Sequence, residues 1–538
     1  MLWLPTTRAR CRRNACGQTR CCFVHRCVVA AGFLLLLCGS WSGTAWSQTA
    51  PSPLRNKTAS PIPQVPPASG IFDQPLNADE AEMAERLARA EAEIQALKQR
   101  LSSPDNVFVA PASGAVSEET SSVFEQRFQA LSHRFDELQA KITPAKLPSV
   151  EVHGVFQADT GWFSQNAASR KAVGDIQDGS DFRRARLSAN GAIADNMNYF
   201  LQMDFAFPGR PTFTDLWFEV TKVPVLGNVR IGQWKQPFSL EVVSSFRYTT
   251  FAERSLLFQA FTPFRHIALG FYDWSEDERM TWAASVYRTG QDQYGGSIAD
   301  NGGYGAVGRI TALPWYDEDS GGSRYLHLGA GYNFVAPGNQ SAQFRTIPEY
   351  FIGSQQNAGS TGTSGIALPD LINGVPFFAD TGKLGVNHYN LVGTELLFVE
   401  GPFSLQSEFM YNFVSRTKGN AVQFPGLYVT AGYFLTGEHR PYLRKAGAID
   451  RIKVLRNFGK HDECGTGWGA WELAARYSSL NLNDSNVPGG RLQDMTLGAN
   501  WYLNSFSKIQ FNYIRAFLDG ATGHSHTDIY GLRAQMDF

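Results

Sequence analysis

The sequence predicts an all-β fold, a 16-stranded antiparallel transmembrane β-barrel, preceded by an N-terminal α-helical coiled-coil segment. Three observations predict it: apolar and polar residues alternate in many short segments after residue 150, long and short connections alternate between these segments, and the last segment ends on an aromatic residue. The chain has 538 residues, and no run of 18 apolar residues occurs beyond the first forty positions. A bundle of membrane-spanning helices is therefore excluded.

The clearest alternation lies between Phe182 and Phe207, where two strands flank a short polar turn at 194–196. In the first arm, small and apolar residues alternate with Arg184, Arg186 and other polar residues. In the second arm the apolar residues share one face, with Phe200 as the exception. A water-soluble sandwich would show the same alternation in one hairpin, but the hairpin recurs to the end of the chain and so favours a barrel.

Sixteen strands can be assigned, an even number typical of outer-membrane barrels. They span 152–163, 182–193, 197–207, 213–221, 229–235, 266–273, 280–289, 304–312, 325–334, 388–399, 403–413, 424–436, 468–480, 491–503, 508–517 and 529–538. If the first strand leaves the periplasm, the long connections 164–181, 236–265, 290–303 and 335–387 face outward, whereas most inner connections are short turns such as 400–402. The inner connection 437–467 is the exception, and it is rich in Arg and Lys.

Residues 1–47 have the features of a signal peptide. Six arginines and no acidic residue accompany an apolar run at 28–37, and Ala45-Trp46-Ser47 is a plausible cleavage site. Six of the seven cysteines lie in this leader, and a zinc site there is the alternative interpretation. Without the leader's six arginines, the 48 basic residues become 42 against 49 acidic ones, so the mature chain is no polycation and no nucleic-acid partner is expected.

Two short heptad segments separate the leader from the barrel. A Pro-rich linker is expected at 48–78, a heptad helix at 79–102, a second linker at 103–122 and a second heptad helix at 123–143. Each helix has only about three heptads, close to the lower limit for independent stability. The two helices either associate with copies of themselves or with each other, or lie as amphipathic helices on the following domain, 151–538.

The last strand is typical of an outer-membrane protein. Tyr530, Leu532, Ala534 and Met536 share one face with the terminal Phe538, and polar residues occupy the other face. Resemblance to outer-membrane proteins implies that the barrel-assembly machinery recognises such a strand.

Five segments within 151–538 resemble the phosphate- and polyphosphate-selective porins of Gram-negative outer membranes. They are DFRRARLSANG at 181–191, VRIGQWKQPFSLE at 229–241, RYTTFAERS at 247–255, YFLTGEHRPY at 433–442 and WGAWELAARYSSL at 468–480. The resemblance implies a trimeric barrel of 16 strands in the outer membrane. It also implies that the third outward loop, here 236–265, and the long inner turn 437–467 bend into the lumen.

Arginine suits a pore for phosphate because its planar guanidinium group offers paired hydrogen-bond donors and stays charged. Arg183 lies on the outward parity but could turn inward, and the pair with Arg184 inherits an anion role from the family motif. The candidate anion-binding residues are Arg183, Arg184, Arg186, Arg230, Lys235, Arg247, Tyr248, Arg254, Arg309, Lys445, Arg476 and Arg533. The alternative is that these arginines pair with lumenal carboxylates, and Glu472 with Arg476 is expected to form such a salt bridge.

The sequence therefore predicts passive diffusion of small anions, with phosphate or polyphosphate as the expected solutes, through a constriction lined by Arg and Lys. The alternatives are a general or sugar-type porin and an envelope tether acting through the heptads. No Ser-His-acid arrangement stands out among the ten histidines, so no catalytic residue and no cofactor are expected. His524-Ser525-His526 is expected to be a solvated loop rather than a metal site.

Overall fold

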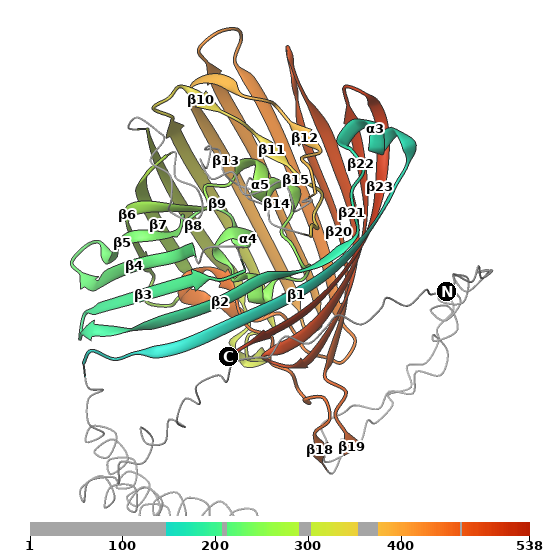
Figure 1. The fold of residues 1–538 in the computed structure, drawn as a ribbon. Helices are drawn as coiled ribbons and strands as arrows, with labels where there is room; N and C mark the ends of the chain where they lie inside the picture. Colours follow the sequence, from blue (N-terminus) through green and yellow to red (C-terminus); the bar gives the residue numbers. More distant parts are fainter. Residues whose placement is uncertain (1–146, 207–211, 290–302, 353–374, 463–464) are drawn as a thin grey trace, which may run out of the picture. The chain divides into compact units, whose positions relative to one another are not determined.

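The computed structural model describes residues 147–206, 212–289, 303–352, 375–462 and 465–538 (Figure 1). The signal peptide, the linkers and both heptad segments lie outside these residues, so they stay predictions. Among the described helices, none is long and apolar enough to cross a membrane.

Sixteen antiparallel strands form a closed barrel, because β1 pairs with β2 on one side and with the last strand, β23, on the other. The wall strands are β1 (Glu151–Gln165), β2 (Gly179–Ala194), β3 (Met197–Asp204), β4 (Thr212–Val223), β5 (Gly227–Lys235), β6 (Arg265–Trp274), β7 (Met280–Arg288), β8 (Tyr304–Tyr316), β9 (Arg324–Ala336), β13 (Leu384–Glu400), β14 (Phe403–Arg416), β15 (Val422–Phe434), β20 (Ala470–Asp484), β21 (Val487–Asn504), β22 (Ser507–Gly520) and β23 (Gly523–Asp537). Each of the sixteen predicted strands is confirmed. The main differences are at the ends, where several strands extend farther than predicted.

The wall has apolar residues outside and polar residues inside. On β23, Leu532 and Met536 are 40% and 50% exposed, while Arg533 is 1% exposed and faces the interior. This is the reverse of a soluble protein, and it matches a barrel that has lipid outside and a polar lumen.

The terminal residue closes the barrel. The backbones of Gly154 and Phe538 exchange two hydrogen bonds, both 3.1 Å long. A Cβ on Gly154 would lie 2.3 Å from Cζ of Phe538, so the glycine makes room for the terminal ring. The C-terminal aromatic residue therefore helps to join the last strand to the first.

The loop 236–264 folds into the barrel, as predicted. It contains α4 (Leu240–Val243), η2 (Phe246–Tyr248) and α5 (Leu256–Phe261). Phe238 is fully buried, and its ring fits against Gly331 on β9 and Gly393 on β13, where a Cβ would lie 2.9 and 2.7 Å from ring atoms. The two glycines on neighbouring strands thus leave room for the Phe238 ring, which anchors the start of the loop.

A second outward connection also enters the barrel, which the sequence analysis did not predict. Between β9 and β13, the strand β10 (Ser341–Ala342) pairs with β13, and β11 (Arg345–Thr346) pairs with β12 (Ala379–Asp380). The hydroxyl of Tyr350 then donates to the carbonyls of Thr160 on β1 and Leu532 on β23, at 3.0 and 3.2 Å. The segment therefore reaches from the β9–β13 side to the β23–β1 side of the wall.

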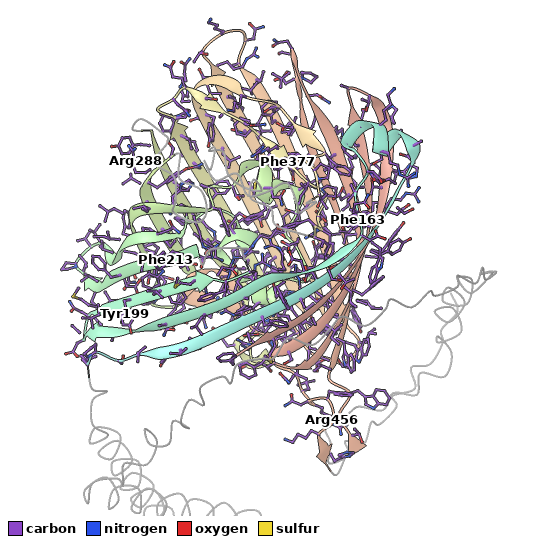
Figure 2. All side chains as sticks on the ribbon, in the orientation of Figure 1. Phe163, Tyr199, Phe213, Arg288, Phe377 and Arg456 are labelled. Atoms are coloured by element: carbon purple, nitrogen blue, oxygen red, sulfur yellow. The ribbon has the colours of Figure 1, made fainter. Side chains whose placement is uncertain are left out.

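Part of the inner turn 437–467 bends inward, as the family resemblance implies, and part of it projects away from the barrel. The short strands β16 (Tyr442–Leu443) and β17 (Ala448–Ile449) flank η4 (Arg444–Ala446), whose C-cap Gly447 contacts Thr281 and Thr311 of the wall. The hairpin of β18 (His461–Asp462) and β19 (Gly465–Thr466) projects from the short-turn end of the barrel, with Arg456 close to its base (Figure 2). Phe458 leads into this hairpin and packs edge-on against Trp501, with ring centroids 4.9 Å apart.

Replacement of Phe238 by Ala is expected to loosen the infolded loop. Removal of a buried phenyl ring costs about 3–5 kcal/mol, and this ring is a direct contact between the start of the loop and β9–β13. Single-channel recording in KCl should show a larger and noisier conductance than for the wild type. Phe413→Ala, on the outer face of β14 and 41% exposed, is the matched control. An unchanged conductance of Phe238→Ala would contradict the anchoring role.

Candidate functional site

Lys235 and Arg254 hold the end of the short helix α4. The ammonium of Lys235 donates to the carbonyls of Val242, Val243 and Ser244, at 2.7, 3.3 and 2.9 Å. Arg254 donates to the carbonyls of Glu241 and Ser244, and burial lowers its pKa to about 10. Both cations therefore compensate the partial negative charge at the C-terminal end of the helix.

A bulge in β2 turns two consecutive arginines into the lumen. Gln157 of β1 lies opposite Arg184 while Ala158 lies opposite Phe182, so Arg183 is an extra residue in the strand. Phe182 remains on the outer face, where it is 55% exposed. Arg183 therefore turns inward despite its outward parity, which the sequence left open, since a bulge changes the side to which a residue points.

Glu253 of the infolded loop is the centre of an arginine cluster. Arg183 donates to both carboxylate oxygens, at 2.9 and 3.2 Å, and Arg533 donates to Oε1 at 2.6 Å. Nη1 of Arg184 lies 3.7 Å from the same oxygen. Burial by itself would raise the pKa of the Glu253 carboxyl, but the three guanidinium groups outweigh it and hold the pKa well below the ordinary range. The loop is thus fixed to β2 and β23 through one ionised carboxylate.

Three further predicted arginines also pair with carboxylates. Arg186 pairs with Asp204 at 2.7 Å, Arg247 lies 3.7 Å from Asp537, and Arg476 donates to Glu349 at 2.7 Å. Tyr248 accepts a hydrogen bond from Arg440 at its backbone carbonyl.

The predicted salt bridge between Glu472 and Arg476 is wrong. Four residues along a strand correspond to about 13 Å, so two side chains on the same face at this spacing are separated by an intervening residue of that face. Glu472 instead pairs with Arg440 of the inner turn, and Arg476 pairs with Glu349 of the second infolded segment.

A cavity of about 320 Å³ remains between the wall strands β4–β8, α4 and η4. Four of the predicted residues line it: Arg230, Lys235, Arg309 and Lys445. Asp215 and Asp273 also line it, and Asp215 is neutralised by Arg265 at 2.7 Å. The structure therefore brings these four cations to one water-accessible space and places the other eight predicted residues elsewhere. Two of those eight, Tyr248 and Arg476, line a second cavity of only about 20 Å³.

Arg230 and Arg309 are held by carboxylates along one edge. Glu219 accepts from Nε and Nη2 of Arg230, at 3.0 and 2.6 Å, and Glu395 accepts from Nε and Nη2 of Arg309, at 2.8 and 2.7 Å. No hydrogen bond to another described residue forms at Nη1 of either group. Each guanidinium is thus fixed in orientation by the carboxylate that it pairs with.

The aromatic residues of the cavity were missed by the sequence analysis. Trp217, Trp234 and Tyr272 line it beside the cations. The sequence does indicate that Trp217 faces the lumen, because it has the same parity as Asp215 and Glu219 on β4. An aromatic residue on the polar parity of a barrel strand indicates a lumenal position.

Acidification is expected to release the infolded loop. The pKa of Glu253 is lower in the folded protein than the value of about 4.3 in an unfolded chain, so its stabilising contribution is complete above that value and is lost as the pH falls. Current noise should rise from pH 7 to pH 3 in the wild type, and Glu253→Gln should already be noisy at pH 7. Glu151→Gln, at an exposed site on β1, is the control. A quiet Glu253→Gln channel at pH 7 would refute this anchoring.

Comparison with known proteins identifies the family. The sequence pattern of the family phosphate-selective porin O and P matches residues 150–538. Porin O of Pseudomonas aeruginosa is 22% identical over 406 residues, covering 71% of this chain and 85% of that protein. An uncharacterized protein of Caulobacter vibrioides is 26% identical over 377 residues, covering 67% of this chain and 68% of that protein.

Among solved structures, an anion-selective porin from Comamonas acidovorans aligns with a TM-score of 0.43 and 12% identity, over 72% of this chain and 99% of that chain. Because the family pattern spans every wall strand, from β1 to β23, the chain belongs to the phosphate-selective porin O and P family and is an outer-membrane porin.

Proposed function

We propose that this porin lets small anions diffuse passively through the cavity between β4–β8 and the infolded loop. The observation that carries the proposal is the pair of fixed guanidinium groups, Arg230 and Arg309, which line the same cavity as Lys445. An anion at this point exchanges part of its hydration shell for charged N–H donors.

Carboxylate pairing keeps the binding weak. Glu219 and Glu395 neutralise much of the charge of Arg230 and Arg309, so an anion meets directed donors without a large net positive field. Lys445 adds a further cation and is 54% exposed at its side chain, 3.4 Å from Glu278. Release of the solute needs such moderate binding, because a porin must pass its solute on.

Phosphate or polyphosphate is the solute class that we propose. The family name supports it, and a guanidinium group offers paired donors that suit the oxygens of a phosphate. We further propose that the chain is secreted by its signal peptide, assembles as a trimer and is recognised by the barrel-assembly machinery through the strand that ends at Phe538.

The twelve predicted residues divide into two roles in this proposal. Arg230, Arg309 and Lys445 contact or attract the anion, whereas Lys235 lines the cavity but uses its three donors for the carbonyls at the end of α4. The remaining residues fix the loops that leave the cavity open: Arg183, Arg184, Arg186, Arg247, Tyr248, Arg254, Arg476 and Arg533.

Reversal of one cavity charge tests anion preference. Lys445→Glu should lower the chloride-to-potassium permeability ratio several-fold, because it replaces an exposed cation by an anion at the cavity. The ratio is measured from the reversal potential in a KCl gradient. Arg515→Gln, at an outward-facing position of β22 with a 44% exposed side chain, should leave it unchanged. No anion preference in the wild type would favour a general porin.

Phosphate block tests the named ligands. Millimolar phosphate should reduce the chloride current, and Arg309→Gln combined with Glu395→Gln should weaken this block about tenfold. The double change avoids an unpaired buried carboxylate. Arg183→Ala with Arg184→Ala should instead alter conductance and noise while leaving the blocking concentration unchanged. The assignment fails if the Arg183/Arg184 variant loses the block and the Arg309/Glu395 variant retains it.

A further inference from the structure

Aromatic rings and cations form a continuous row across four adjacent lumenal strands. Phe200 on β3 stacks on Trp217 on β4, with ring centroids 5.6 Å apart and planes 12° from parallel. The guanidinium carbon of Arg230 on β5 lies 3.7 Å from the Trp217 ring centroid and 5.0 Å from that of Tyr272 on β6.

The row continues to the inner turn. The rings of Tyr272 and Trp274 on β6 have centroids 6.4 Å apart, and Nζ of Lys445 lies 5.3 Å from the Trp274 ring centroid. Trp217, Arg230, Tyr272 and Lys445 all line the cavity of about 320 Å³. This volume lies within the range of about 300–1,000 Å³ that is usual for small-molecule sites.

The rings of this row belong to the lumenal face. Phe200 has the same parity as Gln202 and Asp204, which are 3% and 1% exposed. The next residue after Trp217, Phe218, faces outward and is 41% exposed. Aromatic rings on the outer face of the barrel are covered by lipid. The half-buried rings on the lumenal face have no such cover. Such a partly exposed apolar surface, surrounded by polar groups, is a typical feature of a ligand-contacting site.

We propose that this row binds the carbon ring of an organic phosphate, specifically a sugar phosphate. The inference rests on the proposed anion passage and names a solute class for it. Inorganic phosphate has only oxygen atoms to present and gains nothing from ring faces. A sugar phosphate presents an apolar carbon face to the parts of the Trp217 and Tyr272 rings that Phe200 and Arg230 leave uncovered, and its phosphate to Arg230 and Lys445.

The length of the row suits a sugar phosphate. Four adjacent strands at about 4.8 Å separation give a row about 14 Å long, longer than one sugar ring. Arg230 lies inside the row rather than beside it, so a solute in contact with Trp217 or Tyr272 is within reach of a cation.

Blocking of the KCl current tests the inference in the full-length porin. Glucose 6-phosphate should block at a concentration at least fivefold lower than inorganic phosphate, and glucose alone should block weakly. Trp217→Leu should raise the blocking concentration of glucose 6-phosphate at least fivefold and change that of inorganic phosphate less than twofold, which also reports whether Arg230 is still in place. Phe200→Leu, which leaves the Trp217–Arg230 contact intact, should have a smaller effect in the same direction.

The neighbouring residue supplies the matched control. Phe218→Leu changes an aromatic residue of the same strand that faces outward, and it should leave all three blocking concentrations unchanged. Equal block by glucose 6-phosphate and inorganic phosphate would overturn the sugar-phosphate inference, as would block by glucose alone that is as strong as that by glucose 6-phosphate. A wild-type porin without anion preference in the KCl gradient would instead overturn the proposed function. Failure of the sugar-phosphate inference and failure of the proposed function are therefore distinguishable.

Discussion

The pairing of wall arginines with carboxylates from the infolded segments determines which part of the lumen stays open. Arg183 and Arg533 hold Glu253 of the first loop, and Arg476 holds Glu349 of the second. Glu253, Arg533, Arg476 and Glu349 are buried, so removal of one partner would leave a charge without compensation, at a cost of about 3–5 kcal/mol. Exposed ion pairs contribute only about 0–1 kcal/mol and could not hold a loop against solvent.

Strand positions were predictable because a barrel wall separates lipid from water at every residue. The period of two in Ala185, Leu187 and Ala189 depends only on the face to which each side chain points, and the sequence contains that information directly. The short polar turns at the inner end mark where each strand stops, and they too can be found in the sequence. All sixteen strands could therefore be found without knowledge of any contact.

Partners across the lumen were not predictable by the same reasoning. Parity places Glu472 and Arg476 on one face, but it does not say that Arg440 and Glu349 approach them from two different connections. The bulge at Arg183 reverses parity at one residue, and only the opposite strand reveals it. The second infolded segment did carry a signal, because Phe344, Ile347 and Tyr350 are too apolar for a solvated loop, yet its length alone suggested an external position.

The acidic net charge of the mature chain and an anion path are compatible because the local arrangement of donors decides what a pore accepts. A bare guanidinium in a water-poor cavity would hold phosphate too tightly for rapid passage. Arg230 shares one edge with Glu219 and one face with Trp217, so its remaining attraction is both weakened and directed. The carboxylate that lowers affinity also fixes the orientation of Nη1, and a channel that conducts needs both properties at the same residue.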